Sequence, residues 1–176
     1  AGNSSSSATS FGAGFPVDAG SARAAFTAIE NKSGGEALRL ISGINNPVLT
    51  DVITGLAMGQ DDSPYEFASA QQFLASHPYW PESDRNAIAK QAEGKIGGNV
   101  SPQELLAFFT AYPPQTGDGF VKYIDTLSAM RQTQKIALAI RTRWRETNMG
   151  DDEQKIFVDR FGSSISAADT AYRLDR

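Results

Sequence analysis

The sequence predicts an all-α fold in which antiparallel helix pairs stack as an α-solenoid, a superhelical array. A phrase at residues 73–78 (FLASHP) returns 35 residues later at 108–113 (FFTAYP), and a repeat of that length is typical of one helix–turn–helix unit. Each phrase ends in a proline, which cannot continue a helix, so each predicts the last turn of a helix and a stop. Alternating apolar and polar runs bounded by hairpin turns, the pattern of strands, are missing.

Composition limits the function classes. The 176 residues are 40% hydrophobic, which is enough for a substantial core, and the length favours one domain. A net charge of −4 makes nucleic acid an unexpected partner. The absence of cysteine excludes disulfides and thiolate metal sites. The apolar run at 136–140 is far too short for a membrane span.

The two ends of the chain predict its organisation. Residues 1–20 are rich in Ser, Gly and Ala, which predicts a flexible leader because such a stretch buries little apolar area. Residues 21–176 are expected to form the superhelical domain. The first residue is Ala1, which fits either a removed signal peptide or an excised domain. The last helix runs to Arg176 without a glycine or proline stop, so we expect the chain to be the N-terminal part of a longer protein.

Apolar spacing and breakers predict the first three helices, at 21–31, 36–41 and 47–58. Glycines follow the first two, and the third carries Val48, Val52 and Leu56 at four-residue spacing.

Capping sequences predict where later helices begin. Residues 63–66 (SPYE) and 101–104 (SPQE) share a capping box, in which the serine accepts from the amide three residues on and the glutamate bonds back to the serine amide. Residues 166–169 (SAAD) are interpreted as a weaker box. Apolar stripes at helical spacing predict buried faces on the helices from 101 onward: Leu105, Phe108, Phe109 and Tyr112; Phe120, Ile124 and Leu127; Ile136, Ile140 and Trp144; Phe157 and Phe161.

Three stretches resemble the N-terminal helical region of soluble lytic murein transglycosylases. They lie at 73–93 (FLASHPYWPESDRNAIAKQAE), 108–119 (FFTAYPPQTGDG) and 140–176, and together they cover about half of the chain. Their order and spacing carry the resemblance. The third stretch contributes the most matching positions: Trp144-Arg145-Glu146, Asp152-Glu153, Phe157, Arg160-Phe161-Gly162, Ala168-Asp169-Thr170-Ala171 and Arg173-Leu174-Asp175-Arg176.

The resemblance implies a place and a role. Such proteins act in the bacterial periplasm on peptidoglycan, where they cleave glycan strands and leave a 1,6-anhydro ring. They use one catalytic glutamate and no cofactor. That glutamate belongs to a lysozyme-like domain beyond the helical superhelix. The resemblance therefore implies that this chain frames the glycan strand, positions a downstream catalytic domain, and has no catalytic residue of its own.

Several residues could suggest a catalytic or metal site, but the sequence around each of them favours a structural role. Glu82-Ser83 matches the family's catalytic dipeptide, yet Glu82 lies in a charged first helical turn, where no apolar pocket would raise its pKa. The acids at 151–153 could form a metal or acid–base cluster, and we interpret them as the start of a helix. His77 is the sole histidine, so we expect it to close a helix end rather than bind metal.

Three residues are candidates for binding substrate. Arg141 and Arg145 share a helix face and could contact the carboxylates of peptidoglycan stem peptides; the alternative is an exposed face that pairs with Glu146 and nearby acids. Trp80, with Tyr79 beside it, could stack on sugars or could anchor a helix turn. Arg143 is expected to point away from its two neighbours.

Two other functions stay open. A free-standing tetratricopeptide-like adaptor would bind peptide in a groove, although the usual Trp-Leu-Gly-Tyr signature is absent. A complete small enzyme is the third possibility, and few convergent polar groups support it.

Overall fold

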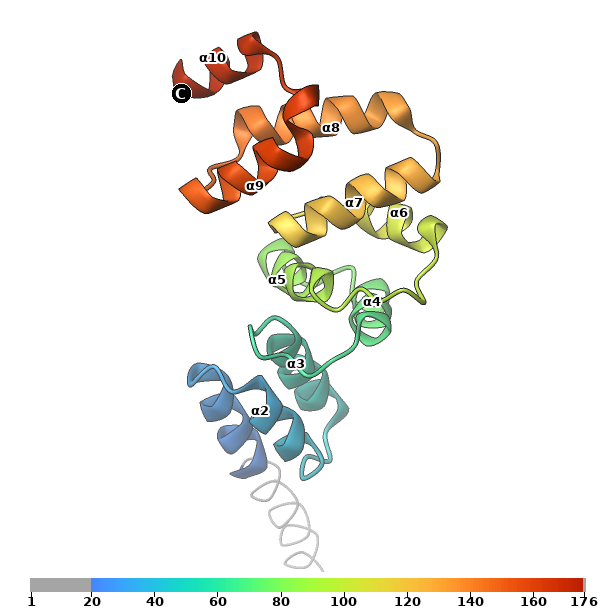
Figure 1. The fold of residues 1–176 in the computed structure, drawn as a ribbon. Coiled ribbons are helices and arrows are strands. Elements are labelled where there is room, and N and C mark those ends of the chain that lie inside the picture. Colours follow the sequence, from blue (N-terminus) through green and yellow to red (C-terminus); the bar gives the residue numbers. More distant parts are fainter. Residues whose placement is uncertain (1–19, 176) are drawn as a thin grey trace, which may run out of the picture. The chain divides into compact units, whose positions relative to one another are not determined.

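The computed structural model describes residues 20–175, and every regular element in that range is helical (Figure 1). The all-α prediction is confirmed, and the helices pack as pairs. Whether the pairs stack as a solenoid stays a prediction. The leader predicted at 1–20 lies, except for its last residue, outside the described residues. The chain divides into two compact units, and the boundary along the sequence falls between Gly97 and Gly98.

In the described part of the first unit, residues 20–30 are helical and pack their alanines against the next two helices. Its labelled helices pack α2 on α3, α3 on α5 and α4 on α5. Their bounds are α2 Gly34–Ile41, α3 Pro47–Met58, α4 Phe67–Ser76 and α5 Glu82–Glu93.

The second unit packs α6 on α7, α7 on α8, and α8 on α10. Its core gathers the apolar stripes that periodicity predicts, including Phe120, Ile140, Trp144 and Phe157. Its elements are α6 Pro102–Ala111, α7 Gly117–Ala129, α8 Thr133–Glu146, α9 Asp151–Phe161, the short 3₁₀ helix η1 Gly162–Ser164, and α10 Ala167–Asp175.

Both repeated phrases end a helix, as predicted. The residue that follows α4 is His77 and the residue that follows α6 is Tyr112. In each case the backbone N–H of that residue donates to the carbonyl four residues back, at 3.0 Å to Phe73 and 2.8 Å to Phe108. The aromatic and proline positions of the phrase therefore close and stop two equivalent helices.

Of the two capping predictions for α4 and α6, the structure confirms one and contradicts the other. Ser101 accepts from the amide of Glu104 at 3.2 Å, and α6 begins with a proline as expected. The box predicted at 63–66 is wrong: α4 begins only at Phe67, and the hydroxyl of Ser63 accepts from the nearby amide of Tyr65 at 3.4 Å instead. Ser63 is buried, so its hydroxyl is used in a local turn that precedes the helix.

Within residues 20–175, no helix has the length and apolar character that a membrane span requires.

Candidate functional site

Arg141 and Arg145 do share a face of α8, as predicted, and their described acidic partner is Asp169 of α10. The Nε atoms of Arg141 and Arg145 donate to Asp169 Oδ1 at 3.3 and 2.7 Å. Asp169 has no exposed surface, whereas the side chains of Arg141 and Arg145 are 49% and 30% exposed. Both arginines therefore join α10 to α8, and their predicted contact with substrate stays a prediction.

The same carboxylate completes the capping box that the sequence ranked as weaker. The amide of Ser166 donates to Asp169 Oδ2 at 2.9 Å, and the amide of Asp169 donates to Ser166 Oγ at 3.1 Å. These bonds, the Ser166 amide foremost, and then the two guanidinium groups hold the pKa of Asp169 well below its usual range, against the opposing effect of desolvation. Asp169 is thus a fixed negative charge in the contact between α8 and α10.

Trp80 lies in the turn before α5 and packs inside the first unit. Its ring meets Phe73 edge-on with 5.0 Å between centroids, and its Cη2 and Cζ3 atoms lie where a side chain at Gly55 would begin. Tyr79 beside it is 77% exposed. The structure shows Trp80 as a packing anchor between α3, α4 and α5, while sugar stacking by this residue stays a prediction.

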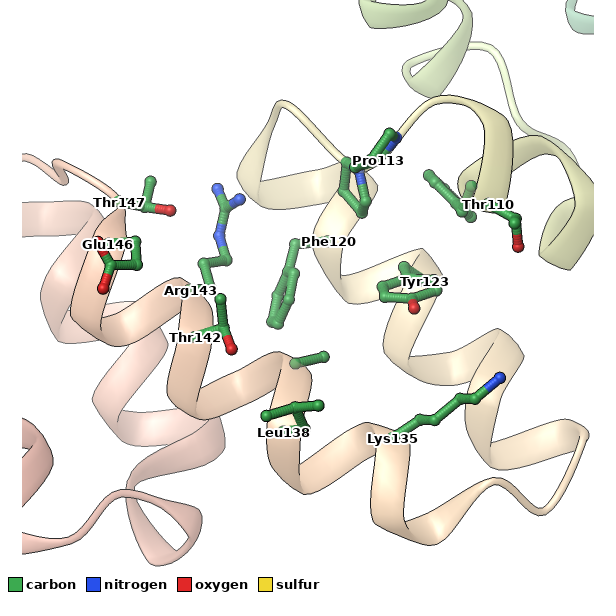
Figure 2. Close-up of a pocket in the computed structure, with 13 residues that line it drawn as sticks. Thr110, Pro113, Phe120, Tyr123, Lys135, Leu138, Thr142, Arg143, Glu146 and Thr147 are labelled. Carbon is green, nitrogen blue, oxygen red and sulfur yellow. The ribbon is translucent and has the colours of Figure 1, made fainter.

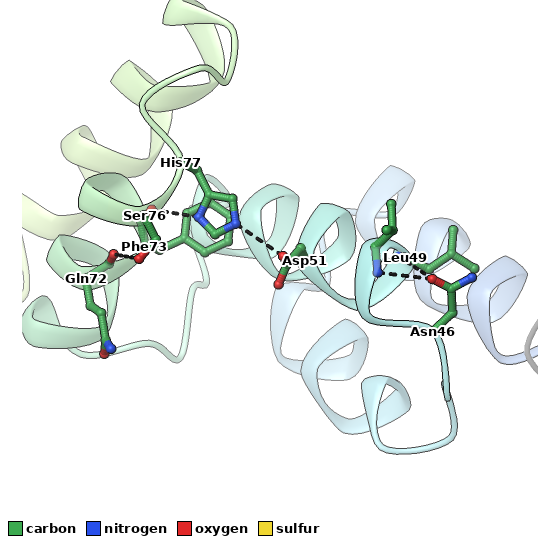
Figure 3. A network of polar contacts seen from close by, with 8 residues as sticks. Asn46, Leu49, Asp51, Gln72, Phe73, Ser76 and His77 are labelled. Atoms are coloured by element: carbon green, nitrogen blue, oxygen red, sulfur yellow. Dashed lines mark hydrogen bonds and ion pairs between the residues drawn. The ribbon is translucent and has the colours of Figure 1, made fainter.

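His77 closes the end of α4, as predicted, and also reaches α3 (Figure 3). Its ring stacks on Phe73 at 3.9 Å between centroids, with Nδ1 at 2.8 Å from the Phe73 carbonyl oxygen and Nε2 at 3.2 Å from Asp51 Oδ2. Both partners can only accept, so both bonds form together only when the ring carries a proton on each nitrogen.

An open hollow in the second unit is the strongest candidate site, and the sequence did not predict it. It measures about 600 Å³ and lies where the end of α6 and its proline loop meet α7 and α8. Its surface is mainly aromatic and apolar, with threonines and three charged groups around it (Figure 2). The lining residues are Phe109, Thr110, Pro113, Pro114, Phe120, Tyr123, Lys135, Leu138, Ala139, Thr142, Arg143, Glu146 and Thr147.

Arg143 forms part of the hollow's wall and is 9% exposed. Its guanidinium lies over the Phe120 ring, 4.9 Å from the centroid, and its Nη2 donates to Glu153 Oε1 at 3.3 Å. The ring and the carboxylate hold the cation in place and balance its charge. Arg143 therefore points away from the other two arginines of α8, as predicted.

Two charges of opposite sign stand along the hollow. Lys135 belongs to the first turn of α8 and Glu146 is its last residue, and both are exposed. Eleven residues separate them, which corresponds to about 16 Å along a helix. Neither forms an ion pair with any residue that the structure describes. Between them lies Leu138, an apolar side chain that is 63% exposed.

The acids that the sequence singled out lie elsewhere. Glu82 is exposed in the first turn of α5, and residues 151–153 form the first turn of α9, as expected for carboxylates at helix starts. Among residues 20–175 no group of acids and histidine is placed to hold a metal ion. Glu93 is 1% exposed at the end of α5 and is not among the residues that line the hollow.

The hollow was missed because the α8 residues that line it lie off the predicted apolar stripe of that helix. Ile136, Ile140 and Trp144 mark the core face of α8, which leaves Leu138 on another face. An apolar residue outside the stripe, with charged residues before and after it on the same helix, was the available signal.

Comparisons with family models, curated proteins and solved structures found no match to this chain.

Proposed function

We propose that this chain is a non-catalytic helical segment of a periplasmic lytic transglycosylase, which binds murein and presents it to a catalytic domain elsewhere in the same protein. The ordered resemblance over residues 73–176 supports the family. The observation that carries the binding role is the open hollow of the second unit, where aromatic side chains lie beside hydroxyl groups and charges. Its volume of about 600 Å³ is that of an ordinary ligand site.

The lining of the hollow favours binding over cleavage. Hydrolytic or transglycosylating enzymes need a carboxyl group whose pKa is raised by an apolar, water-poor setting. Among the lining residues only Glu146 carries a carboxylate, and it is exposed at the end of α8. The hollow therefore offers contact area and charge but no sheltered acid.

A peptide-binding adaptor is the second candidate function. The observation in its favour is Leu138, an exposed apolar residue on a helix that borders an open hollow, between two charges with no ion-pair partner among residues 20–175. Helical-repeat adaptors bind extended peptides on surfaces of this kind.

Co-sedimentation with purified murein sacculi tests the first candidate. We expect the chain to pellet with sacculi and to release no anhydro-muropeptides. Leu138→Asp should weaken binding about fivefold or more, because a charge replaces an apolar contact in the lining of the hollow.

The matched control is Val48→Asp, which alters an apolar side chain of similar exposure, 71%, on α3 in the other unit. This variant should pellet like the parent chain. Failure of the parent chain to pellet, equal loss in both variants, or release of anhydro products would contradict the proposal.

A further inference from the structure

The helix α10 is attached to the second unit without an apolar face. Among its residues, 167–175, the one buried side chain is Asp169. Tyr172 and Leu174 are 44% and 80% exposed, and the core described for the unit contains no residue of α10. Most of the stability of a helix in a protein comes from packing an apolar face, so α10 lacks the usual source of stability.

Charged and polar contacts hold α10 instead. Asp169 accepts from Arg141 and Arg145, and Arg173 donates to two carbonyl oxygens at the end of α8 at 2.7 Å each. Desolvation of the buried carboxylate offsets much of what its ion pairs contribute. The side chains of Arg141 and Arg145 are 49% and 30% exposed, so water already reaches them and can replace α10 as their partner.

Trp144 of α8 is covered in part by α10 and carries an unsatisfied polar group. The guanidinium of Arg173 lies over its ring, 4.7 Å from the centroid, and Phe157 stacks on it with 5.7 Å between centroids. The Nε1 atom of Trp144 is buried and has no hydrogen-bond partner among residues 20–175. A buried donor without an acceptor is unfavourable. Departure of α10 removes the cover by Arg173 and lets water reach the indole, so this cost favours the undocked state.

The chain has a pivot directly before α10. Ile165, which follows η1, packs against the core of the second unit, and its amide donates to the Gly162 carbonyl at 3.1 Å. Ser166 comes next, and it bonds to Asp169 of α10. The segment can therefore stay anchored at Ile165 while the chain from Ser166 onward moves as one piece.

We infer that α10 undocks from α8 as a separate unit while α6 to α9 stay folded, and that undocking uncovers Trp144 and frees the guanidinium groups of Arg141 and Arg145. Regions that bury few apolar side chains open at a lower free energy than the rest of a protein. The inference goes beyond the proposed function and does not depend on it.

Hydrogen exchange of the full chain, followed by NMR at a series of low urea concentrations, tests it. We expect the hydrogen-bonded amides of α10 and the indole N–H of Trp144 to exchange through one opening that depends little on urea. The most protected amides of α7 should exchange only through global unfolding.

Substitutions in the contact should change this opening alone. Asp169→Asn should speed exchange in α10 and at the Trp144 indole by the same factor, about tenfold or more, because it leaves both arginines without their paired charge. Arg141→Gln, at a half-exposed side chain, should speed both about two- to tenfold, and it provides the test if Asp169→Asn does not fold. Asp159→Asn, at an exposed position of α9, is the matched control and should exchange like the parent chain.

The amides of α7 should keep the exchange rates of the parent chain in the Arg141→Gln variant, which shows that the other helices stay folded. Amides of α10 that exchange only together with those of α7 would overturn the inference. Exchange that quickens gradually toward residue 175, with a Trp144 indole that responds to neither substitution, would indicate fraying of the helix end and would overturn it as well.

Discussion

Gly55 illustrates how one missing side chain lets three helices of the first unit approach. A Cβ atom at this position would lie 2.1 Å from Cη2 of Trp80 and 2.8 Å from Cζ of Phe73. Gly55 lies inside α3, where glycine normally destabilises a helix. The close approach of the two rings explains why the smallest residue stands there.

Gly55→Ala should therefore lower the free energy of unfolding by about 1–3 kcal/mol, because overpacking outweighs the gain in helix propensity. Urea unfolding followed by circular dichroism measures the change. Gly35→Ala on α2 is the matched control, since nothing lies within 4 Å of a Cβ there and the substitution should be neutral or stabilising. A Gly55→Ala variant as stable as Gly35→Ala would show that Trp80 does not occupy this position.

Phe108 belongs to the second copy of the repeated phrase, and its substitution tests whether that face of α6 is buried. It is 4% exposed and its ring lies 5.3 Å from that of Phe109. Phe108→Ala should cost about 3–5 kcal/mol by leaving a cavity. Tyr79→Ala, at a side chain 77% exposed, should change the stability little. A loss below about 1 kcal/mol at position 108 would mean that this face of α6 is not buried.

At the scale of elements, the attachment of α10 depends on one buried carboxylate. Asp169 caps its own helix and accepts from two arginines of α8. Arg173 adds a second attachment, because its Nη1 donates to the carbonyl oxygens of Trp144 and Thr147 at 2.7 Å each.

The lowered pKa of Asp169 makes part of the stability depend on pH. The pKa of an aspartate in the unfolded chain is near 3.9. As the pH falls through this value, the unfolded chain binds a proton that the native chain still excludes, because the pKa of Asp169 is lower in the native chain. The contribution of Asp169 is therefore complete above about pH 5 and is lost progressively as the pH falls below about 4.

Asp169→Asn should lower the unfolding midpoint at pH 7 and reduce the dependence on pH between about 3 and 5. Asp159→Asn, at an exposed position of α9, should leave both nearly unchanged. Urea unfolding at a series of pH values measures these effects. Identical acid-side slopes for the parent chain and Asp169→Asn would contradict the role assigned to this carboxylate.

The ends of the helices show which structural features are determined by residues nearby in the sequence. Proline stops, apolar stripes and the cap that Ser101 gives α6 depend on neighbours along the chain, and the structure confirms them. The box at 63–66 failed because burial of Ser63 commits its hydroxyl to a turn, and burial depends on distant residues. The box at 166–169 was ranked too low for a related reason: the arginines that support Asp169 come from another helix.

At the scale of the whole chain, the fold class followed from periodicity, whereas the candidate site did not. Arg141, Arg145 and Trp80 were chosen as isolated charged or aromatic residues, and each has packing or ion-pair partners within its own unit. The hollow brings together positions from Phe109 to Thr147, and only the packing of three helices makes them neighbours. Sequence spacing along one helix could indicate Leu138 but not the surface facing it.

The two compact units also allow binding to be assigned to one part of the chain. The hollow belongs entirely to the second unit, so the proposed murein contact concerns α6, α7 and α8. Ligand-induced changes should therefore concentrate there.

Backbone amide chemical shifts, recorded while soluble muropeptides are titrated into the full chain, test the central claim most directly. We expect saturable shift changes at the residues that line the hollow, from the end of α6 through α7 to the end of α8, with the helices of the first unit unaffected. An unchanged spectrum, or changes centred on α2 to α5, would contradict the claim that this hollow binds murein.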